Sequence, residues 1–233
     1  MIAEKISLER TLIQQEHLAT LGTLAARVAH EVRNPLGAIK ALAQNMQRDQ
    51  TLDPRYHRDL DYIVSETDRL DGCVQGVLDF SRPSSAEPRD IPASELLGNI
   101  ARTLTMQYAS RRLSVESQVE RDWTVKGVDR QALQQVVLNL ALNAVQASPP
   151  DSQVWIKGGR QPDEKPFITV SDEGPGIPAG IRERIWEPWV TTKPRGTGLG
   201  LSIVARNVQE LGGEVRLDTP ARGASVTVTL PGV

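Results

Sequence analysis

The sequence predicts an all-α helical hairpin that pairs into a dimeric four-helix bundle, followed by an α/β sandwich with helices on one face of a mixed sheet. Apolar residues recur at alternating steps of three and four along Leu18–Met46 and again along Leu60–Val77. This spacing is typical of helices that pack through a continuous apolar seam. Beyond residue 92, helical patterns mix with short strands of alternating apolar residues, which favours an α/β domain.

Composition places the chain among ordinary globular proteins. Its 233 residues suffice for two domains, and 39% hydrophobic with 24% charged residues is a usual balance. The net charge of −2 gives no general attraction to nucleic acid, so no nucleic-acid partner is expected. The single cysteine, Cys73, excludes an intrachain disulfide. Because Met1–Arg10 is charged and no apolar run reaches the roughly 20 residues of a membrane span, we expect a cytoplasmic chain or the cytosolic part of a longer protein.

The hairpin is predicted to span residues 17–82, after an N-terminal coiled-coil-like helix at 1–16. Asp53 followed by Pro54 predicts the start of the second helix, because aspartate caps a helix and proline suits its first position. A lone hairpin buries its two seams poorly, so we expect two chains to pair unless the second domain covers that surface. The prolines and serines of residues 83–92 predict a linker, and residues 93–233 form the second domain.

The second domain alternates helices with short strands. Asp129 is the predicted N-cap of its central helix. The segment Gly174–Arg195 is long and loop-rich, and its part from Ile177 to Arg195 is about the length of a mobile lid. The periodicities predict helices at 94–110, 129–147 and 199–211, and strands at 113–119, 154–157, 167–171, 214–217 and 224–230.

One histidine of the first helix has unusual neighbours. His30 lies off the apolar seam, on a largely polar and basic face, with Glu31 beside it and Asn34 one turn further along. A solvated surface residue is the ordinary interpretation of such a histidine. The adjacent carboxylate and the mid-helix Pro35 argue for a chemical role, since a proline costs a helix interior roughly 3 kcal/mol.

Three separated elements of the second domain could build one nucleotide site, and the first is a pair of asparagines. Asn139 and Asn143 are four residues apart and share a face of an otherwise apolar helix. An amide oxygen, together with waters and phosphate oxygens, suits Mg²⁺. The alternative is that both amides bond to neighbouring backbone groups.

The second and third elements are rich in glycine. Asp172, Gly174 and Gly176 follow a predicted strand, where a carboxylate can accept a hydrogen bond from an exocyclic amine such as that of adenine, although this pattern also describes many turns. Gly196–Leu201 opens the last helix, whose N–H groups and dipole favour phosphate. It is neither a Walker A loop nor the dinucleotide fingerprint. Lys193, just before it, is either a phosphate contact or a solvated charge.

The order and spacing of these elements resemble the transmitter region of the sensor histidine kinases of two-component systems. The matches cover the chain nearly end to end. His30-Glu31-x-x-Asn34-Pro35 matches the H box, Asn139-Leu140-x-x-Asn143-Ala144 the N box, Asp172-x-Gly174-x-Gly176 the G1 box, Trp186-Glu187-Pro188-Trp189 with Thr191-Thr192-Lys193 the F box, and Gly196-Thr197-Gly198-Leu199-Gly200-Leu201 the G2 box.

This resemblance implies a dimeric hairpin that bears the phosphoacceptor, and a Bergerat-type ATP-binding fold. It implies that ATP with Mg²⁺ phosphorylates His30, and that the phosphoryl group passes to an aspartate in the receiver domain of a response regulator. An upstream sensor module would lie outside this chain. Glu31 would act as general base or orient the imidazole ring, and Asn34 would position water for dephosphorylation of the regulator.

The resemblance also implies the nucleotide contacts. Asn143 would ligate Mg²⁺, Asn139 would support metal and phosphate, and Asp172 would read adenine. The remaining cofactor-binding positions would be Gly174, Gly176, Thr192, Lys193, Gly196, Thr197, Gly198, Leu199, Gly200 and Leu201.

A gyrase-like ATPase with a helical dimerisation module is the alternative interpretation. In such ATPases the first N-box position is typically a glutamate base, whereas this chain has Asn139, and an amide cannot accept a proton from water. The hairpin with His30 also has no counterpart there. The chain departs from the kinases in two places: Trp186 and Trp189 replace F-box phenylalanines, and Gln146 stands where a basic residue is common.

Overall fold

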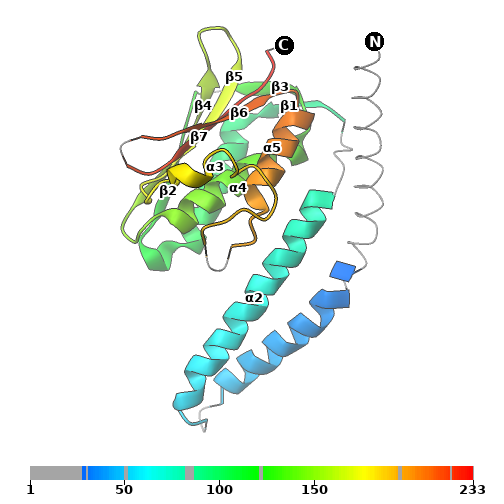
Figure 1. Cartoon of the computed structure of the whole chain (residues 1–233), viewed down its shortest axis with the longest axis vertical. Coiled ribbons are helices and arrows are strands. Elements are labelled where there is room, and N and C mark those ends of the chain that lie inside the picture. Colours follow the sequence, from blue (N-terminus) through cyan, green and yellow to red (C-terminus); the bar gives the residue numbers. More distant parts are fainter. Residues whose placement is uncertain are drawn as a thin grey trace. The chain divides into compact units, whose positions relative to one another are not determined.

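The computed structural model describes residues 28–29, 31–49, 52–81, 87–120, 123–193, 196–220 and 222–232 (Figure 1). The chain divides into two compact units. The first comprises residues 1–83 with the segment 192–197, and the second comprises residues 84–191 and 198–233. None of the described helices combines the length and the apolar character that a bilayer crossing requires. His30 and the predicted helix at 1–16 lie outside the described residues.

Two helices form the hairpin. The described part of the first helix comprises residues 28–29 and 31–47 and continues through Pro35, and α2 spans Arg55–Ser81 (Figure 1). The predicted cap of α2 is confirmed, because Asp53 Oδ1 accepts the backbone N–H of Arg55 at 2.9 Å. The Arg55 guanidinium also donates to this carboxylate, which lowers the pKa of Asp53.

Polar pairs link the two helices of the hairpin along one edge. Their members on the first helix are seven residues apart, so they share a face of that helix. The pairs are Arg33 with Asp71, Lys40 with Asp68, and Gln47 with Asp61. Ala43 of the first helix and Leu60 of α2 are buried. Exposed ion pairs contribute little stability, so the buried residues carry more of the hairpin's free energy of folding.

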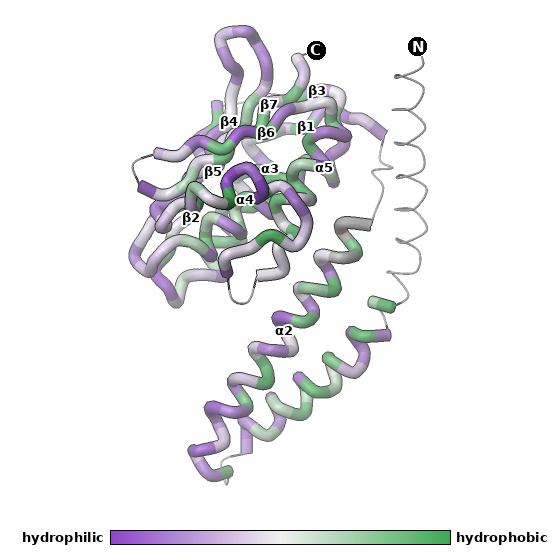
Figure 2. Tube along the Cα trace, in the orientation of Figure 1, coloured by the Kyte–Doolittle hydropathy of each residue, from purple (hydrophilic) through white to green (hydrophobic). Residues whose placement is uncertain are grey.

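Much of the predicted apolar seam is exposed in the single chain. Figure 2 shows apolar stretches that recur along both hairpin helices. Leu42 is 64% exposed. The other exposed seam residues are Val28, Ile39 and Met46 of the first helix and Ile63 and Leu70 of α2. The hairpin alone therefore leaves part of both seams uncovered, as the sequence predicts.

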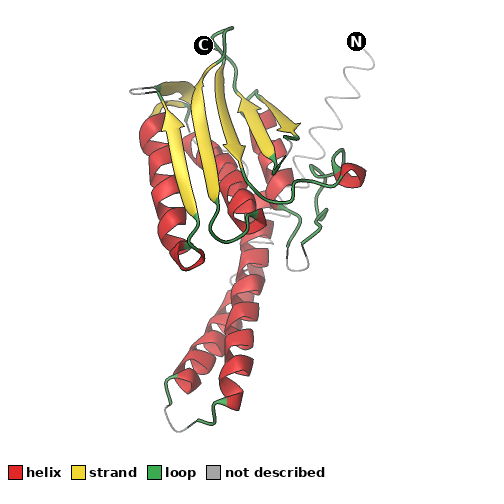
Figure 3. Ribbon diagram, turned by 90° about the vertical axis from the view of Figure 1, so that its left-hand side faces the viewer, coloured by secondary structure: helices red, strands yellow, loops and turns green. Residues whose placement is uncertain are grey.

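The second unit is an α/β sandwich built on a mixed five-stranded sheet. The strand order is β2-β4-β5-β7-β6, with β2 parallel to β4 and the other neighbours antiparallel. The helices cover one face of this sheet, as predicted (Figure 3). The strands are β2 (Ser114–Val119), β4 (Gln153–Arg160), β5 (Pro166–Ser171), β6 (Glu214–Asp218) and β7 (Ser225–Thr229), and the helices are α3 (Ala93–Gln107), α4 (Arg130–Ala147) and α5 (Gly200–Glu210). Two short 3₁₀ helices, η1 (Ala109–Arg111) and η2 (Ala179–Ile181), lie in the connections.

The core of this unit lies between the sheet and the helices. Inward residues of α4 recur at helical spacing, and alternate residues of the central strands meet them. The buried set includes Leu97, Leu133, Val136, Val137, Leu140, Ile156, Ile168, Val204 and Val228. Asp129 caps α4 as predicted, because its Oδ1 accepts the N–H groups of Gln131 at 2.7 Å and Ala132 at 3.3 Å.

The structure corrects the linker predicted at 83–92. Its last four residues form β1 (Arg89–Pro92), which pairs antiparallel with β3 (Thr124–Val128), a strand that the sequence did not predict. Ile91 is buried and lies opposite Val125. Pro92 ends the strand, where a missing N–H group is tolerated. Prolines and charges make this stretch look like a linker, and only the distant partner strand makes it part of the domain.

Candidate active site

The two asparagines of α4 meet the start of α5. Asn139 and Asn143 are both half-buried. A Cβ atom added at Gly200, the first residue of α5, would lie 3.2 Å from Asn143 Nδ2 and 3.7 Å from Asn139 Oδ1. Glycine at this position therefore lets the helix start approach both amides. The structure brings these two predicted elements together, although Asn143 and Gly200 lie far apart in the sequence.

The start of α5 offers backbone N–H groups. Leu199 is its N-cap residue and makes no side-chain cap. The Leu199 carbonyl accepts hydrogen bonds from Ser202 Oγ at 2.9 Å and from the N–H of Ile203 at 3.0 Å. First-turn N–H groups have no acceptor within a helix, and the helix dipole places partial positive charge there. This end of α5 therefore suits an anionic ligand such as a phosphate group.

Asp172 organises the loop that follows β5. Its Oδ1 accepts the N–H groups of Gly174 at 2.8 Å and of Ala224 at 3.3 Å. Gly174 is buried, and a Cβ atom there would lie 2.8 Å from the carbonyl oxygen of Ala147 at the end of α4. The loop predicted to read adenine thus abuts the C-terminal end of the helix that carries Asn143.

Two residues just before β7 hold this loop, and the sequence did not single them out. Gly223 has a φ of +80°, and a Cβ atom on it would lie 1.7 Å from the Asp172 carbonyl oxygen. The Ala224 carbonyl accepts the backbone N–H of Asp172 at 2.9 Å, in addition to the bond from its own N–H to the Asp172 carboxylate. A glycine just before a predicted strand was the available signal. Its partner lies about 50 residues earlier, so a local pattern could not identify the contact.

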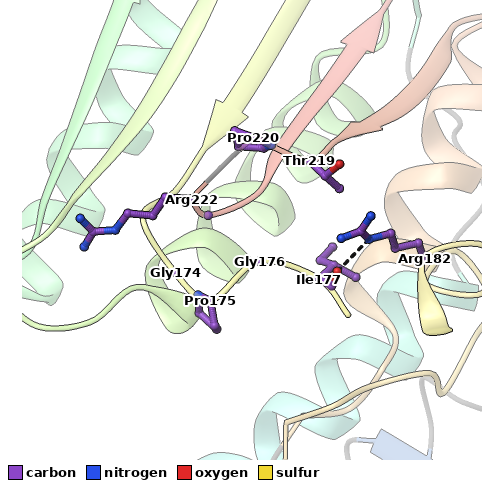
Figure 4. Close-up of a pocket in the computed structure, with 9 residues that line it drawn as sticks. Gly174, Pro175, Gly176, Ile177, Arg182, Thr219, Pro220 and Arg222 are labelled. Carbon is purple, nitrogen blue, oxygen red and sulfur yellow. Dashed lines mark hydrogen bonds between the residues drawn. The ribbon is translucent and has the colours of Figure 1, made fainter. Parts of the chain in front are cut away.

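A cavity lies between the loop after β5 and the turn that joins β6 to β7 (Figure 4). Its volume is about 360 Å³. Arg182 Nε donates to the Ile177 carbonyl at 2.9 Å on one side of it. The cavity shares Gly174 and Gly176 with the predicted site, but neither asparagine of α4 lines it. The contact of α4 with α5 is therefore the better candidate for the centre of the site.

A close backbone contact joins Trp189, which lies within the predicted lid segment, to Gly198, which follows that segment. The N–H of Trp189 donates to the Gly198 carbonyl at 3.0 Å, and the two residues have φ values of +68° and +69°. Trp186 is partly buried against the core, whereas Trp189 is exposed. Leu199 is buried, and Leu201 is partly buried against the core.

Four predicted residues lie in the segment 192–197, which belongs to the first unit. They are Thr192, Lys193, Gly196 and Thr197. Within this segment, the N–H of Gly196 donates to the Lys193 carbonyl at 3.0 Å. The contact between α4 and α5 belongs to the second unit.

On the hairpin, Glu31 and Asn34 lie on the first helix and are exposed. The neighbouring Arg33 crosses to α2, where its guanidinium binds Asp71 and Gln75. These contacts tie the helix turn between Glu31 and Asn34 to α2.

Two family models match consecutive parts of the chain. Residues 20–86 match the His Kinase A (phospho-acceptor) domain, and residues 128–233 match the histidine kinase-, DNA gyrase B- and HSP90-like ATPase. The chain belongs to the sensor histidine kinases. The predicted family resemblance is thereby confirmed, and the gyrase-like alternative is not favoured because it does not account for the phosphoacceptor domain.

Curated relatives in this family cover almost all of the chain. It is 35% identical to the signal transduction histidine-protein kinase AtoS of Escherichia coli over 96% of its length. It is 32% identical to sporulation kinase A of Bacillus subtilis over 99% of its length. The chain spans only 37% and 38% of these two proteins, respectively.

Solved histidine kinase structures share the fold. Full-length ShkA in complex with AMPPNP superimposes with a TM-score of 0.71 at 25% identity, over 91% of this chain and 46% of that one. ThkA in complex with the response regulator protein TrrA superimposes with a TM-score of 0.69 at 26% identity, over 97% of this chain and 66% of that one.

Proposed function

We propose that this chain transfers the γ-phosphoryl group of ATP to His30 and then to an aspartate of a response regulator. The observation that carries the proposal is the approach of Asn143 to Gly200 at the start of α5. The match of residues 20–86 to the phosphoacceptor domain of the family supports His30 as the acceptor. The complex of ThkA with a response regulator supports a receiver domain as the partner.

The nucleotide would bind between α4 and the start of α5. The first-turn N–H groups of α5 would bind phosphate oxygens, and the Asp172 carboxylate would accept a hydrogen bond from the adenine amine. The Asn143 amide would contribute an oxygen ligand to Mg²⁺, a cation that keeps several waters and few protein ligands. The absence of a side chain at Gly200, where a Cβ atom would lie 3.2 Å from Asn143 Nδ2, lets the first turn of α5 approach this amide and fits this arrangement. Bound Mg²⁺ would neutralise charge on the triphosphate.

The chemistry at His30 requires a neutral imidazole. An unperturbed histidine has a pKa of about 6.5, so this form dominates at neutral pH. A ring nitrogen attacks the γ-phosphorus, the bond to the leaving ADP oxygen breaks, and the ring N–H proton passes toward Glu31. Glu31 thus serves as base or orients the ring. We assign Asn34 to the reverse task, the positioning of water for dephosphorylation of the regulator.

We also propose that the functional unit is a homodimer. The exposed seam residues of the hairpin, such as Leu42 and Met46, are apolar and recur at bundle spacing. Two hairpins that pack these seams together would form a four-helix bundle and remove the apolar surface from water.

The deciding experiment is incubation of the protein with Mg²⁺ and γ-labelled ATP, beside His30→Ala and the control His57→Ala. We expect acid-labile, alkali-stable label on the wild-type protein and on the control, and none on His30→Ala. Label that persists in His30→Ala would reject the assigned acceptor. Absence of label, with equal release of free phosphate by all three proteins, would favour the ATPase alternative.

A further inference from the structure

Asn207 is a buried polar residue in the middle of α5. It is 3% exposed and lies beside the buried Val204 and Val208 on that helix. Its Nδ2 donates to Gln135 Oε1 of α4 at 2.8 Å. Its Oδ1 accepts a longer hydrogen bond, of 3.4 Å, from the Arg206 guanidinium. A buried amide needs such partners, so this one is tied to α4 as well as to its own helix.

The hydrogen bond shares helix faces with the candidate active site. Gln135, Asn139 and Asn143 follow one another at steps of four residues, so they lie along one face of α4. Asn207 lies seven residues after Gly200, on the same face of α5. Gln135 therefore meets Asn207 two turns away from the place where Asn143 meets Gly200. The two contacts are about equally far apart on both helices. The eight residues from Gln135 to Asn143 rise by about 12 Å along α4, and the seven from Gly200 to Asn207 rise by about 10.5 Å along α5.

The hydrogen bond between Gln135 and Asn207 fixes the position of α5 along α4, which apolar packing alone leaves adjustable. Apolar side chains can repack after a small slide of one helix along another, with a modest loss. The amides of Gln135 and Asn207 bond to each other across the interface and cannot follow such a slide, because a slide of one residue, about 1.5 Å, separates donor from acceptor. The same slide would move the Asn143 amide away from the start of α5.

We infer that Gln135 and Asn207 are positioning residues that set the register of α4 against α5 and thereby hold Asn143 opposite the first turn of α5. The inference rests on the proposed function, because it concerns the Mg²⁺–triphosphate site assigned there. The pair touches neither nucleotide nor metal. Its effect is on how far Mg²⁺ strengthens the binding of a triphosphate.

The test measures the dissociation constant of AMPPNP by titration calorimetry, in Mg²⁺ and in EDTA. The variants Gln135→Leu and Asn207→Leu are compared with Gln134→Leu, which replaces the exposed neighbour of Gln135. We expect Mg²⁺ to strengthen binding to the wild type and to Gln134→Leu. In Gln135→Leu and Asn207→Leu, the ratio of the dissociation constant in EDTA to that in Mg²⁺ should fall by about tenfold, because the loss of one buried hydrogen bond changes a free energy by a corresponding amount. Binding in EDTA should change by less.

A conservative exchange separates positioning from mere folding. Gln135→Asn shortens one side chain by a single methylene and should lose the Mg²⁺ effect while the protein stays folded. The double variant Gln135→Asn/Asn207→Gln restores the summed length of the pair and should regain it. An unchanged Mg²⁺ effect in both leucine variants, or no rescue by the exchange, would overturn the inference and leave the proposed function intact. A wild type that binds AMPPNP no better with Mg²⁺ than without would instead refute the proposed metal site, and the inference with it.

Discussion

Gly198 and Gly223 occupy positions where the backbone leaves no room for a side chain. A Cβ atom on Gly198 would lie 2.4 Å from the carbonyl carbon of Trp189, and one on Gly223 would lie 1.7 Å from the Asp172 carbonyl oxygen. Both glycines also have positive φ values, which other residues adopt only with strain. Gly198 was predicted as a phosphate-binding glycine. The structure adds a second reason for it, the approach to Trp189.

Gly198→Ala should destabilise the second unit by roughly 2 kcal/mol or more, because the methyl group meets backbone atoms and the φ value is unfavourable. All four tryptophans of the chain (Trp123, Trp155, Trp186 and Trp189) lie in the second unit, so denaturant unfolding followed by tryptophan fluorescence reports on it. Gly180→Ala is the control, because nothing lies within 4 Å of a Cβ atom there. Equal unfolding midpoints for the two variants would contradict this account.

Among the elements, α4 matters most for the site, and its C-terminal end is held by a residue from another helix. The Arg111 guanidinium donates to the carbonyls of Val145, at 3.3 Å, and of Ser148. Last-turn carbonyls have no N–H donor within the helix, so an arginine that donates to them caps the helix and complements its dipole. The same end of α4 touches Gly174 through the Ala147 carbonyl. Arg111 therefore supports the contact between α4 and the Asp172 loop.

Arg111→Ala should lower the free energy of unfolding of the second unit by about 1.5–3 kcal/mol, the value of hydrogen bonds from a charged donor. The adjacent Arg112 is the matched control. Arg112 makes a bidentate ion pair with Asp151 at the surface, which raises the pKa of the Arg112 guanidinium. Exposed pairs of this kind add little stability, so Arg112→Ala should leave the midpoint of the fluorescence transition almost unchanged. A larger effect at Arg112 than at Arg111 would reject the capping role.

The helix caps could be predicted from local sequence patterns, whereas the strand β1 could not. The N-caps at Asp53 and Asp129 were predictable because a cap acts on amides two or three residues away. The strand β1 was not, because its burial comes from pairing with β3, more than 30 residues later. Proline and charge near a strand edge have the same local appearance as a linker.

At the scale of the whole molecule, the exposed apolar seam of the hairpin is the dominant feature. Leu42 is 64% exposed in the single chain, although it lies on the seam that the sequence predicts to be packed. The exposure of recurring apolar side chains to water is unfavourable and is typical of a surface that packs against a second chain. The proposed homodimer would bury it.

Leu42→Asp should convert a dimer into a monomer, because a carboxylate at the centre of a packed seam loses its hydration without a partner. Size-exclusion chromatography with light scattering should give twice the chain mass for the wild type and the single-chain mass for the variant. Ala41→Asp is the control, since Ala41 is exposed and lies off the seam. A wild type that is monomeric at all accessible concentrations would refute the proposed pairing.

The sequence alone determined the division into hairpin and sandwich, the mixed sheet, the order of the motifs and the family. These properties follow from residue spacing and from residue types that act over a few positions. Only the tertiary structure decided which distant groups meet. It placed Gly200 against Asn143, Gly223 against Asp172, and Asn207 against Gln135. Such contacts depend on how elements far apart in sequence pack, and an asparagine in a helix has the same local pattern whether it faces water or another helix.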